Sequence, residues 1–600
     1  MPLYNFFEIQ NKVAKLWNDF EIYKTNNSID SKKLFTIDTP PPTASGSLHI
    51  GHVFSYIQTD IIARYKRISG FEVFYPFGFD DNGLPTERYV EKELVINSYN
   101  YSRSDFTKIC LNEVNKLHEK YTNLWKILGI SSDWRKCYST INPEIQKISQ
   151  QSFIELYKKE YIYKKDEPAL YCTMYRTSVS QADLETIEKE IYFTQLKFKL
   201  KDSNEYILIA TTRPEMLAGC VAIFFHPDDI RYKKYENQIA ITPIYNKEIK
   251  ILPDDKVIQD KGTGLVMCCT FGDQLDIFWF KKHNLPYIKL IELDGKMSEV
   301  TVCIAGKSIK DAREAILEKL KNENYIESQI KINHNVAIYE RSKREIEYIM
   351  LKQWFVKILP YKQKFIELAN QINWYPEGMK QRYINWVENL EWDWCISRQR
   401  FFGIPFPVWY DENENIILPD INDLPIDPIK DSPKINGKFI ADTDVMDTWN
   451  TSSITPFICE NLYSNLSNNN INNFFPMSMR PQAHDIIRTW AFDTIVKSWM
   501  HNQEIPWKDI VISGHVLSSD SQKISKSKDN SPLDPLNLIK LYSADSIRYW
   551  TASSKLGIDT VFSEDKLKDG NRLLIKLCNA GICISNISEF QNYESIDVLN

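Results

Sequence analysis

The sequence lacks any apolar run near the roughly 20 residues that a membrane-spanning helix needs, and its first five residues lack a signal-peptide pattern. We therefore expect a cytoplasmic protein with no membrane partner. A basic surplus is also missing, because the net charge is -6, so any contact with RNA must use local patches. The 11 cysteines show no spacing typical of a disulfide framework or of a four-thiolate zinc site, which indicates reduced, mostly buried thiols.

The length of 600 residues exceeds what one ordinary core supports and predicts about three to five domains of about 100–200 residues each. Hydrophobic residues make up 43% and charged residues 25%, as is usual for globular proteins. A multidomain enzyme is the default interpretation.

Residues 40–52 read PPPTASGSLHIGH and join a predicted strand over 34–37 to a helical pattern that starts near Val53. The prolines stop the strand, Gly46 leaves room for a ligand near the backbone, and the helix N-terminus favours anions. His49 and His52 lie three apart and therefore share one side of the first turn. Such a pair alone is more often a surface, packing or metal pair, so the phosphate site is a hypothesis at this point.

The whole string resembles the adenylate-binding signature of the class I aminoacyl-tRNA synthetases, and its triple proline resembles the valine-specific branch. KISKS at residues 523–527 resembles the second signature of the family, a mobile lysine loop. The resemblance implies ATP with Mg²⁺ as the substrate complex. It implies catalytic roles for His49, His52, Lys523 and Lys526. The residues that it implies at ATP are Gly46, His49, Gly51, His52, Lys523, Ser525, Lys526 and Ser527.

The segment GFDDNGLPTE at residues 78–87 follows a predicted strand over 71–76, at the edge where α/β sheets bind ligands. Taken alone, its Asp-Asp-Asn-Gly is equally well a turn. The resemblance implies that Asp80 binds the ammonium of valine, and that Pro41, Pro42 and Trp449 form the pocket for its side chain. HDIIRTW at residues 484–490 is the segment that favours a valine over an isoleucine enzyme.

Between about 190 and 330 the pattern changes to short strands with turns. Residues 207–215 and 262–276 resemble the hydrolytic editing domain of the valine, isoleucine and leucine enzymes. Composition alone would make the threonines strand formers and Asp276 a helix cap. The resemblance implies instead that Asp276 binds the ammonium of a misattached amino acid, in a pocket lined by Thr211, Thr212 and Arg213.

Residues 169–177 and 339–342 resemble the zinc knuckle of the family, but Tyr175 and Ser342 stand where zinc-binding relatives have cysteine. Only Cys172 remains as a ligand, whereas structural zinc is bound by four Cys or His ligands. We therefore expect no zinc and no other protein-bound metal. The lysine loop departs from the usual pattern at Asp529, where the added negative charge predicts a modest cost in activity.

The predicted fold is α/β: a Rossmann-type catalytic domain split by a β-rich editing insertion and followed by a short α-helical C-terminal region. The predicted parts are 1–188 and 333–535 for the catalytic domain, 189–332 for editing, 536–563 for a linking region and 564–600 for the start of an anticodon-binding bundle. We expect that bundle to be truncated, because the sequence ends at Asn600.

The implied function is activation of valine by ATP, transfer to the 3′ adenosine of valine tRNA, and editing of misattached threonine. We expect a monomer. Three alternatives stay open: an isoleucine enzyme with a wider pocket, a non-catalytic tRNA-binding relative, and a different nucleotidyltransferase that uses the same phosphate loop.

Overall fold

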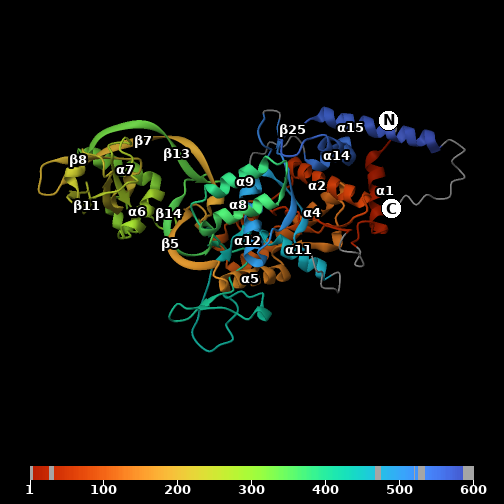
Figure 1. The fold of residues 1–600 in the computed structure, drawn as a ribbon, viewed down its shortest axis with the longest axis horizontal. Coiled ribbons are helices and arrows are strands. Elements are labelled where there is room, and N and C mark those ends of the chain that lie inside the picture. The colour runs from red at the N-terminus through yellow and green to blue at the C-terminus, as the bar shows by residue number, and fades with distance from the viewer. Residues whose placement is uncertain (1–3, 26–32, 466–473, 519–520, 525–533, 586–600) are drawn as a thin grey trace. The chain divides into compact units, whose positions relative to one another are not determined.

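The computed structural model describes residues 4–25, 33–465, 474–518, 521–524 and 534–585. The chain forms two compact units (Figure 1). Unit 1 consists of residues 1–162, 357–393 and 400–600, and unit 2 consists of residues 163–356 and 394–399. Unit 2 is therefore an insertion into the sequence of unit 1.

Unit 1 contains a parallel sheet in the order β2-β1-β22-β23-β15. Its strands are Glu72–Phe74, Leu34–Thr36, Met477–Ala483, Trp507–Ser513 and Asn373–Tyr375. β1 meets β22 through a parallel bridge between Ile37 and Met479, where the Asp38 N–H donates to the Met479 carbonyl at 3.0 Å. After β1 the chain continues to β2 on one side of this junction, and after β22 it continues to β23 on the other. The junction is therefore the topological switch point, where α/β sheets bind ligands.

Helix α2 (Ile50–Ile68) follows β1 and packs one face into the core. It buries Val53, Phe54 and Ile57 at helical spacing, and Lys66 and Arg67 in its last turn complement the negative helix end. The aromatic rings of Phe54 and Trp550 lie 5.3 Å apart, so α14 (Ala544–Ala552) packs on the same helix.

Unit 1 contains further helices and short strands. The helices are α1 (Phe6–Asp19), α3 (Leu84–Leu94), α4 (Arg103–Ile127), α5 (Pro143–Lys158), α8 (Lys362–Gln371), α9 (Met379–Glu388), α10 (Thr448–Ser452), α11 (Thr455–Ser464), α12 (Phe492–Asn502), α13 (Pro535–Tyr542) and α15 (Glu564–Ser585). The short strands are β3 (Phe77–Phe79), β4 (Cys137–Ser139), β18 (Trp409–Tyr410), β19 (Ile416–Ile417), β20 (Ile440–Ala441), β21 (Val445–Met446), β24 (Val516–Leu517) and β25 (Thr560–Val561).

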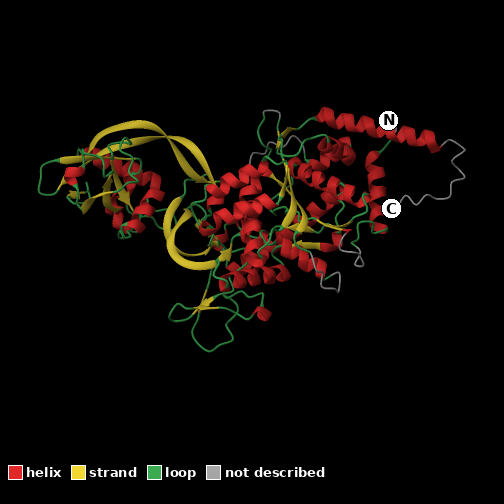
Figure 2. Ribbon diagram, viewed as in Figure 1, coloured by secondary structure: helices red, strands yellow, loops and turns green. Residues whose placement is uncertain are grey.

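Unit 2 is built on a long antiparallel ribbon of β7 (Leu184–Leu200) and β13 (Ile326–Tyr339), which run side by side in Figure 2. The larger sheet has the order β12-β9-β11-β10-β7-β13, and β8 also pairs with β7. Its other strands are β8 (Tyr206–Thr211), β9 (Cys220–Phe225), β10 (Ile239–Ile241), β11 (Glu248–Pro253) and β12 (Leu265–Cys269), with helices α6 (Gln274–Lys282) and α7 (Ile309–Asn322). A second sheet orders β16-β14-β5-β6, with β16 at Trp394–Cys395, β14 at Glu347–Val356, β5 at Ile162–Cys172 and β6 at Thr177–Ser178.

The α/β class with a β-rich insertion is confirmed. The expectation of only short strands between about 190 and 330 is wrong for β7 and β13, which have 17 and 14 residues. Much of this ribbon is exposed and mixes polar and charged residues with apolar ones, so it lacks the buried pattern of a core strand. The five-part domain division stays a prediction. None of the described helices combines the length and apolar character that crossing a membrane requires.

A fully buried ion pair ties β1 to β22 beside the switch point. The Arg480 guanidinium donates to the Asp38 carboxylate at 2.7 Å, and the Trp507 indole N–H donates to the same oxygen at 2.8 Å. The guanidinium also lies over the rings of Trp490 and Trp507, at 4.9 and 5.1 Å from their centroids. Because both side chains are fully buried, the two charges depend on each other.

We expect Asp38→Asn to lower the free energy of unfolding of unit 1 by about 3–5 kcal/mol, since it leaves the Arg480 guanidinium buried without a counter-charge. Urea unfolding followed by circular dichroism measures this loss. The control Glu8→Gln breaks the exposed Lys12–Glu8 pair and should cost less than about 1 kcal/mol. Equal losses in the two variants would contradict the assigned role of Asp38.

Candidate functional site

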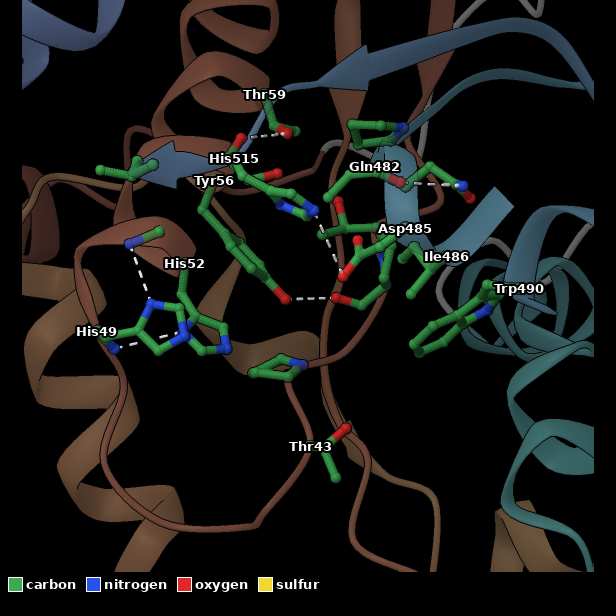
Figure 3. A pocket seen from close by; sticks show the side chains of 18 of the residues that line it. Thr43, His49, His52, Tyr56, Thr59, Gln482, Asp485, Ile486, Trp490 and His515 are labelled. Carbon is green, nitrogen blue, oxygen red and sulfur yellow. Dashed lines mark hydrogen bonds and ion pairs between the residues drawn. The ribbon is translucent and has the colours of Figure 1, made fainter. Parts of the chain in front are cut away.

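A cavity of about 310 Å³ lies at the switch point, at the carboxyl ends of β1, β22 and β23 (Figure 3). The turn after β1 and the first turns of α2 form one wall, and the segments that follow β22 and β23 form the other. The lining residues are Thr39, Pro40, Pro41, Pro42, Thr43, His49, Gly51, His52, Ser55, Tyr56, Thr59, Trp449, Pro481, Gln482, Ala483, Asp485, Ile486, Trp490, Gly514, His515, Val516, Lys523 and Ile524.

The two histidines of the first wall are fixed by the backbone at the start of α2. His49 is the N-cap, and its Nδ1 accepts from the Gly51 N–H at 3.1 Å. Nδ1 of His52 accepts from the His49 N–H at 3.3 Å, and the two rings lie 4.0 Å apart. Because Nδ1 is an acceptor in both rings, Nε2 carries the proton. Each imidazole is therefore a neutral donor at Nε2.

The glycines of the signature have different local tasks. A Cβ on Gly51 would lie 2.9 Å from Cε1 of His49, so only glycine leaves this ring in place. Gly46 has a φ of +112°, which favours glycine, and its carbonyl accepts from the Tyr121 hydroxyl. Gly51 lines the cavity, whereas Gly46 shapes the turn behind it.

The opposite wall carries Lys523, Asp485 and His515. Nζ of Lys523 lies 2.6 Å from the Asp485 carboxylate, and Nε2 of His515 lies 4.0 Å from the same oxygen. Burial opposes ionisation of Asp485, but Lys523 and His515 outweigh it and hold the pKa of this carboxyl below its usual value. Burial lowers the pKa of His515 to about 4, so this ring is neutral near pH 7. Lys523 thus supplies the positive charge of this group.

The residues expected at the amino acid lie next to each other. Pro41, Pro42 and Trp449 line the cavity, and the ring of Trp449 meets that of Trp490 edge to face at 5.6 Å. Asp80 is buried behind Pro42, to whose carbonyl its N–H donates at 3.1 Å. The Asp80 carboxylate accepts from Thr140 and Ser452 hydroxyls at 3.3 and 3.4 Å.

Arg213 and Asp276 of unit 2 meet through a single residue, Gly272. The Arg213 guanidinium donates to the Gly272 carbonyl at 3.0 Å, and the Gly272 N–H donates to the Asp276 carboxylate at 2.7 Å. Thr211 accepts from the Arg213 N–H at 3.0 Å, and Thr212 follows it half-buried. Three of the four residues expected for editing are therefore connected by hydrogen bonds through Gly272, and Thr212 is their neighbour in the chain.

Asp276 and Arg213 differ in how their charges are compensated. Burial, together with the negative charge of Asp273, raises the pKa of Asp276 well above its usual value. Arg213 stays charged because it pairs with Glu347 at 2.7 Å and with Glu215 at 3.2 Å. Ionisation of such a carboxyl becomes favourable when a cation binds next to it. Asp276 is therefore suited to bind a cation.

The zinc-knuckle segments meet through Cys172, whose Sγ lies 3.5 Å from Oγ of Ser342. Within the part of the chain that the structure describes, no group of three or more His, Cys, Asp and Glu side chains is arranged to hold a metal ion. That the protein binds no zinc stays a prediction.

Ser525, Lys526, Ser527 and Asp529 lie outside the described residues. The sequence motifs did not indicate Asp485 and His515 as site residues. Each lies two residues after the carboxyl end of a parallel strand, so the rule that ligands bind at that edge was the available signal.

Comparison with known proteins gives concordant matches. The family model described as tRNA synthetases class I (I, L, M and V) matches residues 12–563. Valine–tRNA ligase of Rickettsia prowazekii (strain Madrid E) is 47% identical over 592 residues, which cover 97% of this chain and 72% of the relative. Valine–tRNA ligase of Anaplasma marginale (strain St. Maries) is 45% identical over 594 residues, with 96% and 72% covered. The solved ternary complex of Agrobacterium radiobacter K84 LeuRS with tRNA and LeuAMS has a TM-score of 0.55 at 17% identity, covering 96% of this chain and 76% of that chain, and is similar in fold.

We expect Gly51→Ala to weaken ATP binding by about tenfold, because the added Cβ displaces the His49 ring and one donor is worth about 1 kcal/mol or slightly more. Isothermal titration calorimetry with ATP measures the change. Gly378→Ala is the matched control, since its Cβ meets nothing within 4 Å. Unchanged ATP affinity in Gly51→Ala would exclude His49 as an ATP donor.

Proposed function

This chain belongs to the class I tRNA synthetases (I, L, M and V), and we propose that within this family it is a valine–tRNA ligase. The observation that carries the proposal is the 47% identity to a valine–tRNA ligase across 97% of the chain. The cavity at the switch point supports it, because donors on one wall face a lysine on the other.

In the proposed reaction a carboxylate oxygen of valine attacks the α-phosphorus of ATP. The bond to the bridging oxygen breaks, pyrophosphate leaves and valyl-adenylate forms. The terminal adenosine 2′-hydroxyl of the tRNA then attacks the valyl carbonyl carbon, and AMP leaves. Mg²⁺ accompanies ATP as part of the substrate.

Few side chains need to transfer protons in this chemistry. We assign His49 and His52 to hold the phosphates through Nε2–H, and Lys523, with Lys526 beyond the described residues, to neutralise the charge that develops on pyrophosphate. Together with Gly46, Gly51, Ser525 and Ser527, these residues form the proposed ATP site.

The proposed valine pocket uses Pro41, Pro42 and Trp449 as apolar walls and Asp80 as the partner of the ammonium. Prolines and a tryptophan offer apolar surface and no side-chain acceptor, which suits a branched aliphatic side chain. Such a pocket rejects a longer side chain by size. It has little means of rejecting threonine, which has nearly the shape of valine.

The assay that tests the function is aminoacylation of valine tRNA, with valine, isoleucine and threonine compared at equal concentration. We expect stable product with valine only. Preference for isoleucine in ATP–pyrophosphate exchange would replace the proposal by the isoleucine alternative, and no adenylate with any of the three would favour the non-catalytic tRNA-binding alternative.

Editing completes the proposal. For valine enzymes of this family the known discrimination against threonine by binding is only about a hundredfold, which leaves a need for a second, hydrolytic site. We assign that site to Thr211, Thr212, Arg213 and Asp276, with the Asp276 carboxylate paired to the ammonium of the misattached threonine.

We expect Asp276→Asn to leave the valylation rate unchanged and to let threonyl-tRNA accumulate, because asparagine still accepts from the Gly272 N–H but lacks the charge that binds an ammonium. Thin-layer analysis of labelled tRNA measures both products. Asp228→Asn, at a highly exposed position of the same unit, is the control and should edit normally. Absence of threonyl-tRNA with Asp276→Asn would refute the assigned role.

A further inference from the structure

Residues 557–562, which follow α14, pack against the strand ends that form the lysine side of the cavity. The Gly557 N–H donates to the Ile512 carbonyl and the Thr560 N–H to the His515 carbonyl, both at 2.8 Å. β25 pairs in parallel with β24, directly after β23. A Cβ on Gly514 would lie 2.0 Å from the Ile558 carbonyl oxygen, so the backbones meet without room for a side chain.

Asp559 is the residue of this segment that reaches both strand ends. Its Oδ1 accepts from the backbone N–H of His515 at 2.8 Å and lies 2.8 Å from Nε2 of His484. His484 and His515 follow β22 and β23, and their rings lie 4.0 Å apart. Nη1 of Arg382 lies 3.2 Å from Nδ1 of His484, and since arginine only donates, Nε2 of His484 carries the proton toward Asp559.

Lys523 is contacted by two residues that lie close in the chain to these histidines. Asp485 follows His484 in the chain and pairs with Lys523 at 2.6 Å. The backbone of Lys523 forms a bridge with Leu517, two residues after His515. The Asp559 carboxylate thus contacts both of the segments that hold Lys523, close to where each leaves the sheet.

We propose that Asp559 is a positioning residue for adenylate formation, which aligns Lys523 with the phosphates of ATP by tying the ends of β22 and β23 together through His484 and His515. The inference rests on the proposed function. Asp559 itself is not among the residues that line the cavity.

A purely stabilising role fits the position poorly. The Asp559 side chain is 41% exposed, and exposed charged pairs contribute little to the free energy of unfolding. A shift of the strand ends would instead move Lys523 relative to the leaving group, and small misplacements of catalytic groups are costly in rate.

The test is ATP–pyrophosphate exchange by Asp559→Ala and Asp559→Asn in the full chain. We expect kcat to fall by about tenfold to a hundredfold in Asp559→Ala with the KM for valine unchanged. Asp559→Asn should lose less, because its amide oxygen still accepts from the His515 N–H. Asp569→Asn is the matched control, since Asp569 is also 41% exposed and paired on α15, and it should behave as wild type.

A double variant separates positioning from general damage. If Asp559 acts through Lys523, then Asp559→Ala should reduce kcat by no more than about twofold when Lys523 is already alanine. Equal fold-losses in the presence and absence of Lys523 would overturn the proposal, as would full activity of Asp559→Ala. Should Asp559→Ala fail to fold, Asp559→Asn is used in the same cycle. Wild-type protein without valine-dependent exchange would refute the proposed function instead, so the two failures are distinguishable.

Discussion

The buried Asp38–Arg480 ion pair is the constraint on which unit 1 depends, because it joins segments 442 residues apart in sequence at the point where the sheet changes direction. Asp38 precedes the proline turn, and Arg480 lies in β22, which ends at Ala483 just before His484 and Asp485. A fully buried charge pair repays its desolvation only with good geometry, which narrows the arrangements it accepts. The ion pair therefore fixes the two walls of the cavity relative to each other without a ligand.

Under the proposed function both units bind the ammonium group of an amino acid, in different settings. In unit 1 the carboxylate assigned to the ammonium, Asp80, is buried next to apolar walls and accepts from two hydroxyl groups. In unit 2 the corresponding Asp276 accepts from a backbone N–H that Arg213 holds in place. Under the proposed function the first site would select by shape, and the second by polar contacts that depend on an intact charged cluster.

The parts of this structure that follow from local sequence could be predicted. The strand, proline stop, glycine and paired histidines of residues 34–52 lie within one short stretch, and their arrangement follows from helix and strand geometry. The family resemblance led to the α/β fold with a β-rich insertion, which is confirmed. Contacts across long sequence separation, such as Asp38 with Arg480 or Asp559 with His484, have no local signal. The long ribbon of β7 and β13 was missed because exposed strands that mix polar with apolar residues do not resemble a buried core strand.

The neutral state of His49 and His52 has a consequence for how the phosphates are held in the proposed reaction. Since both rings accept backbone N–H groups at Nδ1, they offer Nε2–H donors that orient an anion without adding net charge. The positive charge next to pyrophosphate then comes from Lys523 on one wall and from the N-terminal end of α2 on the other. Orientation of the phosphates and attraction for them are thereby assigned to different groups of one cavity.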